Sequence, residues 1–322
     1  MVVVAPNAFK ETFSPLRAGR LIARGLSRTL RARFLLMPVA DGGDGTMEAL
    51  RSRIGGRLVT TRVTGPLGSP VRARYLRAGR TAVIEMAEAS GLKLVPRRRR
   101  DPLAATTRGT GELIAHAWRH GARSILLGVG GSATVDGGAG ALEVLPPAAV
   151  RNTTVLCDVD NPLLGPRGAA PVFGPQKGAT PTVVRRLQRR LRRWARLLRA
   201  RTGMDVRRLR GGGAAGGLAA GLAAHGARLV RGSDFILKAV GFPPRRCDFV
   251  VTGEGCVDRT SLEGKAVGAV LRASPAPVVL VCGRCNLPGL PAFETRDRSP
   301  AALVEAAARA GRFIQKRLDR GR

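Results

Sequence analysis

The stretch Phe34-Leu-Leu-Met-Pro-Val-Ala-Asp-Gly-Gly-Asp-Gly-Thr46 runs from an apolar segment through an acidic, glycine-rich loop into the expected start of a helix. Residues 34–39 have the composition of a buried strand. Further acidic loops, around Asp136, Asp160 and Glu254, follow apolar runs in nearly the same way. Open α/β sheets bind their ligands where the strands end. Carboxylates at these places predict an enzyme that uses metal or acid–base chemistry on a small anionic substrate.

Outward from this stretch, the chain alternates predicted strands with predicted helices. Short apolar segments bounded by turn residues predict strands at 1–5, 82–86, 124–129, 154–156, 248–251 and 277–282. Ser14 and Pro15 have the pattern of a helix N-cap and first position, Ser299-Pro300 repeats it, and residues 181–201 carry an apolar helical stripe. The alternation predicts an α/β fold with a mainly parallel sheet.

Length and composition narrow the class of protein. The 322 residues, 44% of them hydrophobic, suffice for one large or two ordinary folded domains. No apolar stretch approaches the roughly 18 residues that a membrane-spanning helix needs, and the first residues lack the features of a signal peptide. We therefore expect a cytoplasmic protein without a membrane partner. Five cysteines do not indicate a disulfide framework, and Cys282-Gly-Arg-Cys285 is interpreted as a turn after a strand.

The charge is unusual, with 55 Lys and Arg against 22 Asp and Glu and a formal net charge of +33. One explanation is binding to nucleic acid or a membrane surface. The other is a solvated surface on which arginine is abundant throughout. Aromatic residues make up only 4% of the chain and no nucleic-acid-binding motif is present, which favours the second explanation. We expect no specific nucleic-acid partner, but nonspecific and salt-sensitive binding to polyanions.

The sequence contains neither a P-loop nor a G-x-G-x-x-G fingerprint after its first strand. Taken in order, however, its glycine-rich and acidic segments resemble the bacterial glycerate kinase family, which phosphorylates D-glycerate with ATP. The segments that carry the resemblance are 5–11, 38–46, 65–68, 84–92, 106–114, 128–134, 158–163, 172–179, 211–217 and 252–255. They cover almost the whole chain. The resemblance implies two α/β domains, a flavodoxin-like domain built from residues 1–62 and 231–322 and an inserted domain of residues 63–230.

The resemblance also implies ATP and Mg²⁺ as cofactors and D-glycerate as the substrate. Phosphoryl transfer needs cations at the phosphates, oxygen ligands for Mg²⁺, donors for the glycerate carboxylate and a base near the attacking hydroxyl. The predicted catalytic residues are Asp160, Asp41 and Lys10, with Asp136 as a third candidate base. The predicted substrate-binding residues are Ser132, Thr134, Asp136, Arg108 and Asn161. The predicted nucleotide-binding residues are Lys177, Lys265, Gly42 and Gly43, and the predicted metal ligands are Glu254 and Asp258. For each acid the alternative is a helix cap or a turn former.

Four features depart from the usual pattern of the family. Asn7-Ala8 stands where the family usually has Asp-Ser, so a negative charge is absent there. Val135 replaces a usual Asn, and Thr260 replaces a usual Gln. The segment between Leu145 and Thr154 is several tens of residues shorter than usual, and the loss of a strand predicts an exposed sheet edge or apolar face.

These departures keep two further hypotheses open beside an active kinase. One is a catalytically impaired or repurposed glycerate-kinase-like protein. The other is an arginine-rich nucleic-acid-binding protein on the same scaffold. The retained segments 158–163 and 252–255 favour an active enzyme. The salt dependence of binding distinguishes the nucleic-acid-binding hypothesis from the other two, because polyanion binding weakens steeply with salt, whereas specific glycerate binding should not.

Overall fold

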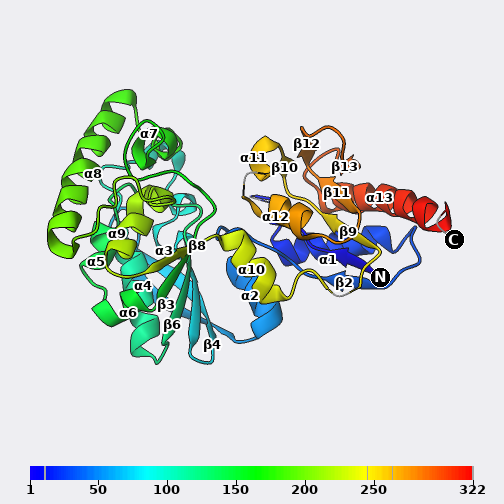
Figure 1. The fold of residues 1–322 in the computed structure, drawn as a ribbon, viewed down its shortest axis with the longest axis horizontal. Helices are drawn as coiled ribbons and strands as arrows, with labels where there is room; N and C mark the ends of the chain where they lie inside the picture. The colour runs from blue at the N-terminus through cyan, green and yellow to red at the C-terminus, as the bar shows by residue number, and fades with distance from the viewer. Residues whose placement is uncertain (11, 245, 263, 321–322) are drawn as a thin grey trace. The chain divides into compact units, whose positions relative to one another are not determined.

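The computed structural model describes residues 1–10, 12–244, 246–262 and 264–320, and it divides the chain into two compact units (Figure 1). Glu11, the last residue of the first family-like segment, lies outside the described residues. Unit 1 consists of residues 1–53 and 233–322, and unit 2 of residues 54–232. Each unit has its own β-sheet and its own hydrophobic core.

Unit 1 has a five-stranded parallel sheet made from both ends of the chain. Its strands lie in the order β2 (Phe34–Leu36), β1 (Val2–Val4), β9 (Phe249–Thr252), β11 (Val278–Cys282) and β13 (Ala292–Glu294). In chain order this is 2-1-3-4-5, the flavodoxin-like arrangement that the resemblance implied. Val2 pairs with Phe34 on one side and with Phe249 on the other. The order reverses between β1 and β9, which makes their carboxyl ends the topological switch point.

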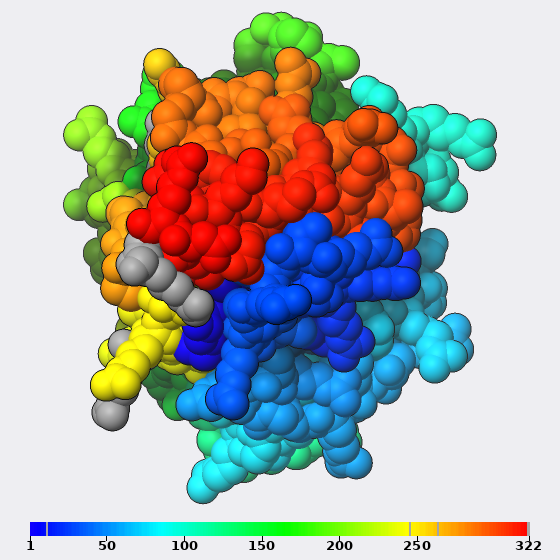
Figure 2. Space-filling view, turned by 90° about the vertical axis from the view of Figure 1, so that its right-hand side faces the viewer, coloured from blue at the N-terminus to red at the C-terminus, as the bar shows by residue number. Residues whose placement is uncertain are grey.

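Helices on this sheet bring the two chain ends together. Helix α1 (Pro15–Leu26) begins as predicted, because the Ser14 side chain accepts a hydrogen bond from the Arg17 amide. It packs against α13 (Pro300–Arg320), and Thr29 Oγ1 donates to the Ala308 carbonyl at 2.8 Å. Figure 2 shows this contact as the blue N-terminal segment lying against the red C-terminal helix. The remaining elements of unit 1 are α2 (Thr46–Ile54), α10 (Gly232–Val240), α11 (Arg259–Leu262), α12 (Ala266–Ala273) and the short pair β10 (Cys256–Val257) and β12 (Arg284–Cys285).

Unit 2 has a six-stranded mixed sheet. Its strands follow the chain as β3 (Arg57–Thr64), β4 (Pro70–Ala78), β5 (Thr81–Glu85), β6 (Ser124–Gly128), β7 (Thr153–Leu156) and β8 (Arg228–Val230). Strand β4 pairs antiparallel with β3 and with β5, and the pairings from β5 through β6 and β7 to β8 are parallel. The carboxyl ends of β5, β6 and β7 therefore lie at one edge, which positions the loops that follow them.

Helices connect and cover this sheet. They are α3 (Ala87–Ser90), α4 (Arg108–Arg119), α5 (Ala139–Leu142), α6 (Pro147–Arg151), α7 (Ala169–Phe173), α8 (Pro181–Thr202) and α9 (Leu218–Ala224), with 3-10 turns at 92–94, 97–99, 175–177 and 214–217. Among the described residues, no helix is long and apolar enough to cross a membrane.

The shortened segment leaves the sheet continuous. The short helices α5 and α6 lead directly from β6 to β7, and β7 pairs with β6 on one side and β8 on the other. Val155 and Leu156 have no exposed surface. The prediction of an exposed edge or apolar face at this place is therefore wrong for β7, because two short helices suffice for the crossover and both neighbours of the strand remain.

Candidate active site

Two buried polar side chains meet at the switch point of unit 1. Asn7, after β1, donates from Nδ2 to Oε2 of Glu254, after β9, at 3.2 Å. The other oxygen of Glu254 accepts a hydrogen bond from Ser261 Oγ at 2.6 Å. Asn7 and Glu254 are 4% and 6% exposed. A carboxylate is thus oriented by two donors at the place where this class of sheet binds ligands.

The surroundings of Glu254 disfavour its ionised form. Burial raises the pKa of its carboxyl group above the ordinary value, and the neighbouring Asp41 carboxylate adds to this, while Ser261, Lys265 and Asn7 oppose it. A cation bound to the carboxylate would offset the cost of burial, because an opposite charge favours the ionised form. These properties suit the metal ligand that we predict at this position.

A second chain of hydrogen bonds lies a few residues further on. Lys265 Nζ donates to Thr260 Oγ1 at 2.6 Å, and Thr260 Oγ1 donates to Asp258 Oδ1 at 2.6 Å. The bond from Thr260 lowers the pKa of Asp258, and the Lys265 charge acts in the same direction. Lys265 also occupies the N-cap position of α12, where helix amides favour anions. Thr260, one of the departures from the family pattern, is the link between the predicted metal ligand and the predicted phosphate-binding lysine.

The acidic glycine loop of unit 1 is arranged by its own side chains. Asp41 Oδ1 accepts from the Gly43 amide at 3.1 Å, and Thr46 Oγ1 donates to the Gly43 carbonyl at 2.8 Å. Gly42 has a φ of +86°, which a residue with a Cβ rarely adopts. Asp41 is half-buried, and its charge acts on Glu254. Asp41 therefore stabilises the turn through Oδ1, as the alternative interpretation of this residue predicted. Its other oxygen, Oδ2, is the one that a ligand could use.

Lys10 is exposed and follows the buried residues 5–9 after β1. The backbone of this segment runs beside Gly255, where an added Cβ would lie 3.8 Å from the Lys10 amide nitrogen. Lys10 is therefore brought near the segment that carries Glu254, as a cation for phosphate would need to be.

In unit 2, Asp136 is the centre of a buried hydrogen-bond network. Its carboxylate accepts from the amide and the hydroxyl of Thr107, both at 2.8 Å, and from the amides of Gly138 and Gly140 at 3.1 and 3.3 Å. The residue is 3% exposed. Four donors use its oxygens, so Asp136 holds the loop after β6 against the start of α4. Its direct role toward the substrate stays a prediction.

Lys177 holds the other half of the same loop. Its Nζ donates to Ser132 Oγ and to the Thr134 carbonyl, both at 2.8 Å, and the side chain is 2% exposed. Burial lowers the pKa of Lys177 to about 7, although the Asp136 charge acts in the opposite direction. The structure thus joins Ser132, Thr134, Asp136 and Lys177. It places the lysine beneath the loop, where it fixes the Ser132 hydroxyl.

This burial makes the stability of unit 2 depend on pH. Because the folded pKa of Lys177 lies below the ordinary 10.5, the unfolded chain binds more protons between these values, and stability rises as the pH increases from about 7. The slope is at most ~1.4 kcal/mol per pH unit for one proton. We expect the free energy of unfolding to rise between pH 7 and pH 9, and the variant Lys177→Met to lack this rise.

Tryptophan fluorescence during urea unfolding measures this, since Trp118 and Trp194 both belong to unit 2. Lys238→Met, which removes an exposed lysine, is the control and should keep the wild-type slope. Equal slopes for Lys177→Met and the wild type would show that Lys177 does not titrate in this range.

Asp160 and Asn161 follow β7 and belong to a third group. Arg210 forms a bidentate pair with the Asp160 carboxylate, with both distances 2.7 Å, and Arg231 lies 3.4 Å from it. The bond from Arg210 lowers the pKa of Asp160. Asn161 Nδ2 donates to the Arg167 carbonyl at 2.8 Å, which fixes the loop. Asp160 is 39% exposed and ionised at neutral pH, as an acceptor for a substrate hydroxyl must be.

Arg108 is the first residue of α4, next to Thr107, whose amide and hydroxyl bind Asp136. Its guanidinium pairs with Glu112 and with Glu143, both at 3.1 Å. These carboxylates compete with an anionic substrate for the arginine. Direct binding of glycerate by Arg108 would require a rearrangement of these pairs.

Several residues at these sites were not found from the sequence. Ser261 orients Glu254, Thr107 binds Asp136, and Arg210 and Arg231 hold Asp160. Arg210 directly precedes a family-like glycine segment, but one arginine carries little signal in a chain so rich in them. Ser261 and Thr107 are common residue types, and no sequence pattern connects Ser261 with Glu254 or Thr107 with Asp136, 29 residues away.

Asn7 offers a test of the switch point. An aspartate there would place a second carboxylate at hydrogen-bond distance from Glu254, and two such groups cannot both ionise without a cation. We expect Asn7→Asp to have a lower melting temperature than the wild type in EDTA at pH 8, and to recover when Mg²⁺ is added. The control Asn7→Ala removes the same hydrogen bond without adding a carboxylate, so it should recover less than Asn7→Asp when Mg²⁺ is added. Equal responses of the two variants would show that a carboxylate at position 7 does not join Glu254 in binding a cation.

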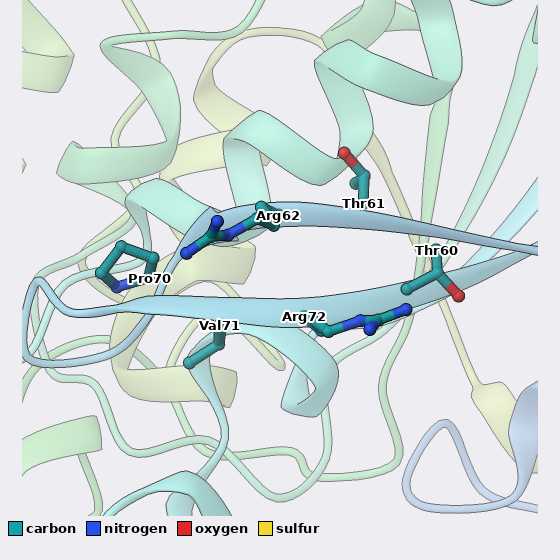
Figure 3. Close-up of a pocket in the computed structure, with 6 residues that line it drawn as sticks. All are labelled: Thr60, Thr61, Arg62, Pro70, Val71 and Arg72. Carbon is teal, nitrogen blue, oxygen red and sulfur yellow. The ribbon is translucent and has the colours of Figure 1, made fainter.

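A separate pocket of about 470 Å³ lies on the β3–β4 hairpin (Figure 3). Its lining includes Arg62 and Arg72, which are paired across the two strands. None of the predicted site residues lines it, and no carboxylate does. We therefore assign the candidate site to the strand ends and not to this pocket.

Comparison with known proteins shows the family to which the chain belongs. The model of the glycerate kinase family matches residues 2–153 and 144–315. The chain belongs to the glycerate kinase family. The two matched parts meet at the shortened segment before β7. The glycerate kinase of Bacillus subtilis is 41% identical over 322 residues, covering 88% of this chain and 84% of that protein, and the glycerate 2-kinase of Escherichia coli is 38% identical with the same coverage. A crystal structure described as a putative glycerate kinase 2 from Salmonella typhimurium has a TM-score of 0.83 and 37% identity, covering 99% of this chain and 98% of that one.

Proposed function

We propose that this protein transfers the γ-phosphoryl group of ATP to a hydroxyl group of D-glycerate. The observation that supports this most is the oriented Glu254 carboxylate at the switch point of unit 1, in a chain of the glycerate kinase family. In the reaction the substrate hydroxyl oxygen attacks the γ-phosphorus, the bond to the bridging oxygen breaks, and ADP leaves. The hydroxyl proton passes to a carboxylate.

We assign that carboxylate to Asp160, with Asp41 as the alternative. Asp136 is less suited to this step, because four donors already bind its oxygens. The low pKa of Asp160 keeps it ionised, so it orients the hydroxyl and passes the proton on to water. Phosphoryl transfer has little need of a strong base, since positioning and charge stabilisation supply most of the rate. Ser132, held by Lys177, supplies a donor for the glycerate carboxylate.

The donor set of unit 1 fits Mg²⁺. Among the described residues, no group of three or more His, Cys, Asp or Glu side chains could hold a metal ion. Mg²⁺ in kinases is usually bound by one or two carboxylates together with phosphate oxygens and water. Glu254 and Asp258 would hold it, and it would neutralise charge on the phosphates. Lys265 and Lys10 would neutralise the rest as compact positive charges.

The test is ADP release from ATP and Mg²⁺ by the purified full chain, with and without D-glycerate. Glycerate-dependent ADP release is the expected result, and ³¹P NMR of the product identifies the 2- or 3-phosphate. The E. coli relative is named a 2-kinase, so the 2-phosphate is the product we expect. Folded protein that releases no ADP with glycerate would reject the proposal.

One observation favours an impaired kinase as the second candidate. Asn7 takes the place of a usual Asp, so the side chain that contacts Glu254 is a neutral amide and not a second carboxylate. This candidate predicts binding of ATP or glycerate with little turnover. Calorimetric binding without ADP release would support it over the active kinase.

A further inference from the structure

Helix α8 carries an unusual concentration of charge. Residues 181–202 contain nine arginines and no acidic residue. Four of them, Arg186, Arg189, Arg190 and Arg193, are spaced three or four residues apart and line one pocket of about 620 Å³. Like charges at this spacing repel one another. The pocket therefore concentrates positive charge on one face of the helix, at a cost that a bound anion would remove.

The arginines of this pocket have few partners. Within the part of the chain that the structure describes, Arg190 donates to the Leu103 carbonyl at 2.8 Å, and Arg186, Arg189 and Arg193 have no hydrogen bond or ion pair. Asp136 is the one acidic residue in the lining. It is 3% exposed and its carboxylate accepts from four neutral donors. Its single negative charge is therefore directed into the loop and is outnumbered by the four guanidinium groups.

The lining of the pocket is joined to the loop after β6. Trp194 lines the pocket and donates from Nε1 to the Gly137 carbonyl at 2.9 Å. Gly137 has a φ of +71°, and a Cβ on it would collide with the indole ring. Ala139, from the same loop, also lines the pocket. A ligand here would contact both α8 and the loop that Asp136 organises.

We infer that this pocket binds a small anion bearing two or more phosphate groups, through Arg186, Arg189, Arg190 and Arg193, and that the bound anion restrains the loop of residues 136–140. Guanidinium groups match phosphate oxygens in charge and in hydrogen-bond geometry. The volume suits a small ligand, and the pocket offers one indole and no row of aromatic rings on which successive nucleic-acid bases would stack. All of its lining belongs to unit 2.

Binding of inorganic pyrophosphate to the full chain tests this, by calorimetry at fixed moderate salt. The pocket variant Arg186→Gln, Arg189→Gln, Arg193→Gln is expected to bind about tenfold more weakly or worse, because three charge-assisted contacts are lost. The matched control Arg192→Gln, Arg196→Gln, Arg199→Gln removes the same charge from residues of α8 outside the pocket and should bind as the wild type does. Equal weakening in both variants would overturn the proposal in favour of diffuse attraction.

A second measurement tests the link to the loop. Hydrogen exchange at the amides of Gly138 and Gly140, which donate to Asp136, is expected to slow when pyrophosphate binds. Unchanged exchange would overturn the restraint of the loop. If a short single-stranded RNA, and not pyrophosphate, loses binding in the pocket variant, the surface binds nucleic acid and the proposal fails. Neither measurement uses turnover, so the outcome does not depend on the proposed kinase activity.

Discussion

Glu254→Gln is expected to lower glycerate-dependent turnover roughly 100-fold or more, because the Mg²⁺ ion that we propose Glu254 holds would supply several kcal/mol of charge stabilisation. The fold should survive the change. Burial raises the pKa of the Glu254 carboxyl group in the folded state. The folded protein therefore binds this proton more tightly than the unfolded chain does. The free energy of unfolding falls as the pH rises from the unfolded pKa to the folded pKa. The neutral glutamine removes that loss. We therefore expect a melting temperature at pH 8 equal to or above the wild-type value, together with a large loss of turnover.

The measurement is the rate of ADP release as a function of Mg²⁺ concentration. The variant should need more Mg²⁺ for half-maximal rate, which a purely structural residue would not change. Glu305→Gln serves as the matched control, because Glu305 is an exposed acid of the same unit with a weak partner, Arg296, at 4.0 Å. Wild-type Mg²⁺ dependence in Glu254→Gln would remove Glu254 from the metal site.

The buried parallel strands were predictable from sequence, whereas the parallel edge strands β8 and β13 and the antiparallel strands β3 and β4 were not. Segments such as 124–129 and 277–282 are continuous apolar runs, and they form β6 and β11 within one residue of the predicted bounds. Strands β3 and β4 instead mix arginine and other polar residues with apolar ones. Only their inner face is buried, so the apolar runs that mark fully buried strands are absent. Pairing with the neighbouring strand, which no local pattern specifies, decides their structure.

The position of a side chain was predictable where it follows a strand, because chain order alone places it at the edge of the sheet. Glu254 follows β9 and Asp160 follows β7, as this reasoning predicted. What the sequence did not indicate was which partners each acid would have. The Asp136 carboxylate accepts hydrogen bonds from Thr107 and from the amides of Gly138 and Gly140. The Asp160 carboxylate instead forms an ion pair with Arg210, 50 residues away in the chain. These differences arise from tertiary contacts, and they decide whether a carboxylate holds a loop or faces a ligand.

Asp160→Asn is expected to reduce turnover about 100-fold or more while leaving the fold intact, the loss typical for a general base. The substitution keeps the shape of the side chain but removes the charge that accepts the substrate hydroxyl. Its effect on the melting temperature should be small, because Asp160 is 39% exposed and exposed ion pairs contribute little to stability. Steady-state kinetics with D-glycerate should show the loss mainly in kcat.

A matched pair in the same unit separates this role from the mere loss of an ion pair. Asp205 is an exposed acid bound to Arg207 at 2.6 Å, so Asp205→Asn removes a similar interaction and should leave turnover unchanged. Arg210→Gln gives an independent signature. Arg210 lowers the pKa of Asp160, so its loss raises that pKa and should move the acidic limb of the kcat/KM profile to higher pH. If Asp160→Asn and Asp205→Asn behave alike and the profile of Arg210→Gln does not move, Asp160 has no part in proton transfer and Asp41 becomes the base to test.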